Sequence, residues 1–120
     1  MALQFSFTKY ENEALPDFRK KLNLAESTED VINFFVHAVM ELLESIFRDK
    51  IDFNYEDFTL ILDHEPHYMV SRRIFSSKEF MSVWHNSDLP RVIGRFAKSA
   101  VSRYNRLEKY SEKTDTKIRK

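Results

Sequence analysis

The feature that most constrains the fold is a long apolar segment, Val31–Phe47, in which 12 of 17 residues are apolar. Its polar residues recur mostly every three or four positions, as one narrow stripe along a helix does. Ser27 and Asp30 fit a capping box in front of the segment, so we predict a helix over residues 28–49. A helix that is apolar around most of its girth lies at the centre of a fold or is covered by another subunit.

A second long helix is predicted over residues 89–111. Asp88 is a suitable N-cap, and Pro90 is tolerated in the first turn. Beyond about residue 112 the chain is polar, and we expect it to fray. A shorter helix should start at Ser76 or Ser77 and end at His85. The apolar stripe of the long helix has a period of 3.6 and comprises Leu89, Val92, Ile93, Phe96, Ala97, Ala100, Val101, Tyr104 and Leu107.

Strand-like patterns lie between the helices. The β-prone runs Phe58–Leu62 and Tyr68–Phe75 flank the polar segment Asp63–His67, which predicts a β-hairpin over residues 58–75. Apolar residues also alternate with polar ones over 51–55 and 3–7, where further short strands are possible. At 120 residues the chain should form one domain. We predict an α+β fold with a small antiparallel sheet, and the alternative is an all-α bundle.

Two further expectations concern helix packing. Within the mixed segment 10–24 we expect a short helix that has Pro16 in its first turn. Gly94, the one glycine in the chain, lies inside the 89–111 helix. An interior glycine usually has a packing reason. We therefore expect it to let the 28–49 helix approach closely, and we expect these two long helices to pack against each other.

Charge is distributed unevenly, although the net charge is zero. Residues 1–88 hold nine Lys/Arg and 16 Asp/Glu, whereas residues 89–120 hold ten and three. Such asymmetry indicates an anionic partner or complementary self-association. The cations that share one face of the last helix could follow nucleic-acid phosphates. Alternatively, they pair with the acidic stretch Glu41–Glu65. The candidate nucleic-acid-binding residues are Arg91, Arg95, Lys98, Arg106, Lys109 and Lys113.

Candidates for chemistry are sparse. With a single glycine, the sequence contains no phosphate-cradling loop, and without cysteine it contains no thiolate nucleophile. His64 and His67 stand beside two carboxylates in the predicted hairpin loop, so they are candidate metal ligands, although a solvent-facing turn is the better explanation. His37 and Glu41 are one helical turn apart and could form a general-base pair or an ordinary polar seam. No cofactor is predicted.

Together these patterns predict a non-enzymatic interaction protein that self-associates or docks on a protein partner. The alternative is a nucleic-acid-binding domain, and the third hypothesis is a metal- or His-dependent enzyme. We expect a cytoplasmic protein without a membrane partner, because the most apolar segment is interrupted by polar residues. If the central helix lies at a subunit contact, its interface residues should be Phe34, Phe35, Val39 and Leu42.

Overall fold

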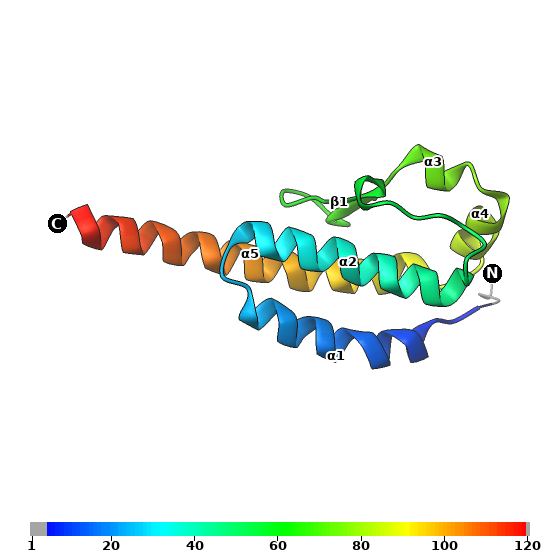
Figure 1. Ribbon diagram of the computed structural model, residues 1–120, viewed down its shortest axis with the longest axis horizontal. Helices are drawn as coiled ribbons and strands as arrows, with labels where there is room; N and C mark the ends of the chain where they lie inside the picture. The colour runs from blue at the N-terminus through cyan, green and yellow to red at the C-terminus, as the bar shows by residue number, and fades with distance from the viewer. Residues whose placement is uncertain (1–4, 120) are drawn as a thin grey trace.

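A computed structural model describes the backbone of residues 5–119 and the side chains of residues 5–109. Three long helices lie side by side, and the hairpin and short helices cover one side of them (Figure 1). Helices α1 and α5 run in the same direction, and α2 runs opposite to both. This is the predicted α+β fold. The elements are α1 (Thr8–Leu24), α2 (Thr28–Phe47), η1 (Tyr55–Asp57), β1 (Phe58–Leu60), β2 (Tyr68–Val70), α3 (Arg72–Phe75), α4 (Lys78–His85) and α5 (Leu89–Arg119).

Helix α2 begins where the sequence predicts. The Asp30 backbone N–H donates to Ser27 Oγ at 3.1 Å. The Asp30 carboxylate in turn accepts from the backbone N–H of Glu26 at 3.0 Å, one residue before the N-cap. At the other end, Arg48 has a left-handed φ of 47°, so α2 ends at Phe47 instead of Asp49.

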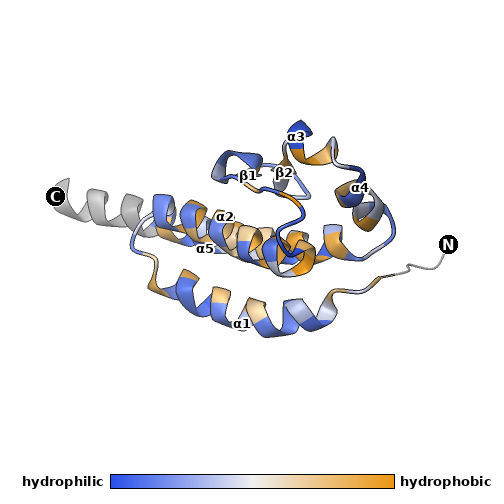
Figure 2. Ribbon diagram, turned by 45° about the vertical axis from the view of Figure 1, so that its right-hand side comes forward, coloured by the Kyte–Doolittle hydropathy of each residue, from blue (hydrophilic) through white to orange (hydrophobic). Residues whose placement is uncertain are grey.

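The core closes within one chain. Helix α2 packs on α1, α5 and β1. In Figure 2 the hydrophobic stretches of the α1 ribbon lie on its edge toward α2 and α5. Three of the residues predicted at a subunit interface, Phe35, Val39 and Leu42, are at most 4% exposed in this core. Phe34 is half-buried. The apolar girth of α2 is therefore covered by the chain's own elements, and the predicted interface is wrong for those three residues.

Helix α1 is longer than predicted. Pro16 was expected in the first turn of a short helix, but α1 begins at Thr8 and holds Pro16 in its interior. Pro16 is exposed, whereas Leu15, Phe18 and Leu22 are buried at helical spacing. Burial of this apolar face sustains the helix despite the proline. In front of α1 the predicted strand is reduced to a single parallel bridge between Phe5 and Ser87, and Leu3 lies outside the described residues.

The hairpin is present but short. Phe58 pairs with Val70 and Leu60 with Tyr68 in an antiparallel register. Residues 61–67 form the connecting loop. The second predicted run stops as a strand at Val70 and continues as α3.

The strand predicted at 51–55 is wrong. Asn54 begins a 3-10 turn, in which its backbone N–H donates to Asp57 Oδ2 at 2.8 Å. Phe53 is buried against Phe47 and Phe80. The alternation of apolar residues therefore reflects one buried ring next to a local turn and no strand pairing.

Helices α4 and α5 begin where the sequence predicts. The Phe80 backbone N–H donates to Ser77 Oγ at 3.3 Å, so Ser77 and not Ser76 caps α4. Helix α5 packs on α2 as predicted. It continues past the predicted end near Ser111 to Arg119, since no glycine or proline interrupts the segment after Gly94. Gly94 faces the Tyr68 ring, which lies 4.0 Å from where a Cβ would stand. No atom of α2 lies within 4 Å of that position, so our prediction that Gly94 lets α2 approach closely is wrong.

Candidate nucleic-acid interface

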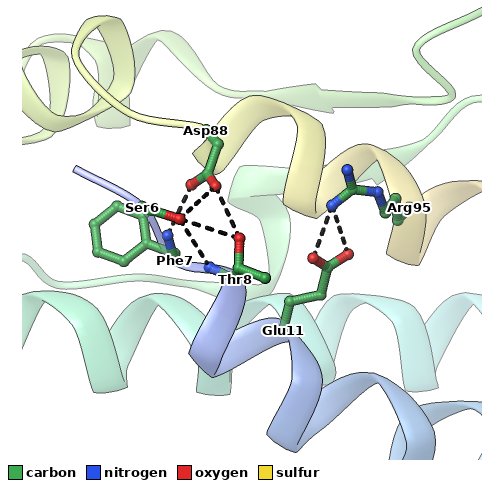
Figure 3. Close-up of polar contacts among 6 residues, drawn as sticks. All are labelled: Ser6, Phe7, Thr8, Glu11, Asp88 and Arg95. Carbon is green, nitrogen blue, oxygen red and sulfur yellow. Dashed lines mark hydrogen bonds and ion pairs between the residues drawn. The ribbon is translucent and has the colours of Figure 1, made fainter. Parts of the chain in front are cut away.

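The N-terminus of α1 is fixed by a residue that lies 80 positions further along the chain. Asp88 accepts hydrogen bonds from the Phe7 backbone N–H at 2.8 Å, from the Ser6 hydroxyl at 2.9 Å and from the Thr8 hydroxyl at 3.2 Å (Figure 3). Burial opposes ionisation of Asp88, but these hydrogen bonds outweigh it and lower its pKa. The Asp88 carboxylate, which was predicted to cap α5, thus binds the start of α1. The backbone carbonyl of Asp88 accepts hydrogen bonds from the backbone N–H groups of Arg91 and Val92 in the first turn of α5.

Two α5 arginines hold α1 further along. Arg95 Nη1 contacts both carboxylate oxygens of Glu11, at 2.7 and 2.8 Å (Figure 3). Glu11 is buried and Arg95 is half-exposed. The hydrogen bonds that Arg95 donates to Glu11 raise the Arg95 pKa. Arg103 donates to the carbonyls of Asn23 and Ala25, where a cation complements the negative end of α1. Arg95 is therefore engaged within the chain before any partner binds.

Other predicted cations have no such partner. Among the residues whose side chains the structure describes, no carboxylate lies within ion-pair distance of Arg91, Lys98 or Arg106. The same holds for Lys109, and the side chain of Lys113 lies outside the described residues. The acidic stretch Glu41–Glu65 does not pair with the described α5 cations. The alternative in which these charges cancel each other is thus not what the structure shows.

Four α5 cations line a groove between α5 and α1: Arg95, Lys98, Arg103 and Arg106. This groove has a volume of about 470 Å³ and contains five cationic side chains and no carboxylate. Arg19 is a member that the sequence analysis missed, because nothing in the sequence shows that α1 lies alongside α5. Arg19 Nε donates to Ser99 Oγ at 3.3 Å across the groove. We call this feature the basic groove; it is lined by Arg19, Leu22, Asn23, Arg95, Lys98, Ser99, Ser102, Arg103 and Arg106.

A second concavity lies on the hairpin side of α5, and we call it the hairpin hollow. Its volume is about 430 Å³. Arg95 and Lys98 line both the hollow and the basic groove, so the two concavities adjoin along α5. The hollow is lined by Glu65, Pro66, His67, Tyr68, Pro90, Arg91, Gly94, Arg95 and Lys98.

The candidate metal ligands do not converge. His64 Nδ1 lies 2.9 Å from Asp63 Oδ1, whereas His67 Nδ1 contacts the carbonyl of Ile61 at 2.9 Å. Within the described residues, no three His, Asp or Glu side chains gather closely enough to hold a metal ion. The sequence neighbours His64 and His67 therefore have separate local partners.

The candidate general-base pair is also not assembled. His37 packs edge-on against the Tyr55 ring, with 5.8 Å between the centroids. No hydrogen bond joins His37 to Glu41 in the described part of the chain. Both side chains line a groove of about 540 Å³ between α1 and α2, together with Phe34.

Two observations bound the context of this interface. None of the helices within the described residues combines the length and apolarity needed to cross a membrane. Comparison of the chain with models of known protein families, with curated proteins and with solved structures finds no match to any of them.

Proposed function

We propose that this protein is a non-enzymatic nucleic-acid-binding module that contacts phosphates along the basic groove. The observation that carries the proposal is the composition of the groove: five cations from two helices line it, and no carboxylate does. Phosphate contacts from Lys and Arg supply most of the sequence-independent affinity for nucleic acid. Lys98 and Arg106 are free of described carboxylates, as is Arg91 just beyond the groove.

The side of α5 that carries Arg91, Lys98, Arg106 and Lys109, which we call the basic face, has a length that suits a short nucleic-acid segment. Arg91 and Lys109 are separated by 18 helical steps, which correspond to about 27 Å at roughly 1.5 Å per residue. At about 3.4 Å per nucleotide, the rise of a stacked strand in a duplex, this length matches roughly eight nucleotides. Serine hydroxyls of Ser99 and Ser102 in the same groove add donors for phosphate oxygens.

The proposal is tested by reversing the free cations. We expect the triple variant Arg91→Glu, Lys98→Glu and Arg106→Glu to lose retention on DNA or RNA at about 50 mM salt, where phosphate contacts are strongest. Wild-type affinity should fall steeply with added salt. Arg95 is kept, because its replacement would leave Glu11 buried without a partner.

A matched control carries the same change of net charge elsewhere. Lys20→Glu, Lys21→Glu and Lys50→Glu alter three exposed cations outside the basic groove, and this variant should bind as well as wild type. Absence of wild-type binding at about 50 mM salt, or equal loss in both triple variants, would overturn the proposal.

Self-association remains a second candidate, supported by the groove between α1 and α2. Three carboxylates line it beside the half-buried Phe34, together with Lys20 and Lys21. These carboxylates, Glu13, Asp17 and Glu41, can pair with the basic face of α5 in a second copy. Light scattering tests this function. A concentration-dependent mass that Glu13→Lys and Asp17→Lys abolish would support it, and a constant monomer mass would contradict it.

A further inference from the structure

We infer that the nucleic acid is single-stranded and that one of its bases enters the hairpin hollow while its phosphates follow the basic groove. This inference rests on the proposed function and names its substrate class. Nucleotides combine a planar apolar face with a negative charge. The hairpin hollow offers apolar surface from Pro66, Tyr68 and Pro90 directly beside cationic side chains.

The adjacency of the two concavities supports a continuous path. Arg95 and Lys98 belong to both linings. A nucleic-acid strand with a phosphate at Lys98 can therefore place a neighbouring nucleotide over the hollow. A base can turn into such a hollow only when it is unstacked and unpaired, as bases in single strands are. The volume of about 430 Å³ lies within the range of roughly 300–1,000 Å³ that is typical of small-ligand sites.

Gly94 keeps the floor of the hollow open. Its missing side chain leaves the Tyr68 ring as the nearest neighbour, 4.0 Å from the Cβ position. Tyr68 is fixed there because its hydroxyl donates to the Pro90 carbonyl at 2.9 Å. Burial raises the pKa of Tyr68 to about 12, so this donor keeps its proton at neutral pH. The floor is therefore an apolar ring that a hydrogen bond holds in place.

His67 gives the hollow a polar edge in a constrained position. Its φ is 73°, in the left-handed region that non-glycine residues seldom adopt. The loop holds it there through His67 N–H to His64 O at 3.0 Å and Ile61 N–H to His67 O at 2.8 Å. The Ile61 carbonyl can only accept, so Nδ1 of His67 carries the proton. Nε2, the other ring nitrogen, is left for a polar contact with a base.

The experiment compares two oligonucleotides with the same number of phosphates. One has bases, the other is abasic, and each has about 10 nucleotides so that it spans the basic face. Binding is measured by fluorescence anisotropy at about 50 mM salt on the full chain. We expect wild type to prefer the base-containing strand by about tenfold, as stacking of one base provides.

Two variants should remove this preference. Gly94→Leu fills the hollow, and His67→Gly removes the ring at a φ that glycine adopts without strain. Both should bind the two strands equally, at the level of wild type on the abasic strand. Met69→Ala, on the exposed side of β2, is the control and should keep the preference. Circular dichroism checks that each variant is folded.

The outcomes separate the inference from the function on which it rests. Equal wild-type affinity for both strands overturns the base site and leaves the phosphate groove standing. Tighter binding to a duplex than to the single strand also overturns it. If neither strand binds wild type, the proposed function fails together with the inference.

Discussion

At the residue scale, Gly94 keeps space open in the hairpin hollow but lowers the stability of helix α5. A methyl group there would meet only the Tyr68 ring, at ordinary van der Waals distance. We expect Gly94→Ala to raise the free energy of unfolding by about 0.5–1 kcal/mol, since glycine is a poor residue inside a helix. Urea denaturation measures the change. Ser102→Ala on the exposed face of α5 should change stability by less, and destabilisation by Gly94→Ala would contradict the open space beside Tyr68.

Asp57 makes the fold sensitive to acid. Burial disfavours its ionised form, but hydrogen bonds from Arg73, Ser71 and the Asn54 N–H outweigh this effect and lower the pKa below 3.8. The ionised carboxylate therefore stabilises the fold at neutral pH. This contribution is complete above the unfolded-state pKa and disappears as the pH falls through the lower folded-state value.

Replacing this carboxylate should flatten the pH dependence. We expect Asp57→Asn to be less stable than wild type at neutral pH and to converge with it between about pH 5 and pH 2. Urea denaturation at several pH values measures both curves. Asp63→Asn, at an exposed loop position, should follow wild type, and parallel curves for Asp57→Asn and wild type would contradict the assigned role.

At the element scale, the N-terminus of α1 depends on the residue in front of α5 for its hydrogen bonds. Asp88 accepts three hydrogen bonds from the first residues before and within α1. We expect Asp88→Ala to lower the free energy of unfolding by about 1–2 kcal/mol, as loss of a helix cap does. Hydrogen exchange should speed up at the N-terminal amides of α1 more than in α2. Asp17→Ala, at an exposed α1 position, is the control, and uniform exchange in Asp88→Ala would contradict the local role.

The elements recovered from the sequence were those with a long, regular apolar period. Residues 28–47 and 89–107 have such a period, and their caps could be found at Ser27 and Asp88. Helix α1 was underestimated because Pro16 usually marks a first turn, and only tertiary packing of Phe18 and Leu22 overrides it. The alternation at 51–55 resembled a strand, since a turn that places Phe53 in the core gives the same pattern.

At the scale of the whole molecule, the core needs no second copy. Val31, Phe35 and Val39 are fully buried by the chain itself. The urea midpoint of unfolding should therefore not depend on protein concentration from about 1 to 50 μM, because mass action stabilises only folds that require association. A midpoint that rises with concentration would contradict a self-sufficient core and favour the second candidate function.

The candidate site was predictable only in part. Helical spacing placed Arg91, Lys98 and Arg106 on one face, because a helix fixes which residues share a side. Spacing could not show that Arg95 forms an ion pair with Glu11 or that Arg19 lines the groove. Glu11 and Arg19 lie on α1, about 80 residues before their partners on α5. Contacts between distant segments depend on the tertiary arrangement, which local periodicity does not encode.

The attachment of α1 through Asp88 has a consequence for synthesis in the cell. A ribosome produces residues 8–24 first, yet the carboxylate that satisfies Phe7, Ser6 and Thr8 emerges only after residue 88. The N-terminal end of α1 can therefore be capped only late in translation, although α2 is available to pack on α1 earlier. A pause placed shortly before codon 88 would leave the start of α1 without this cap, and therefore more open to proteases or chaperones.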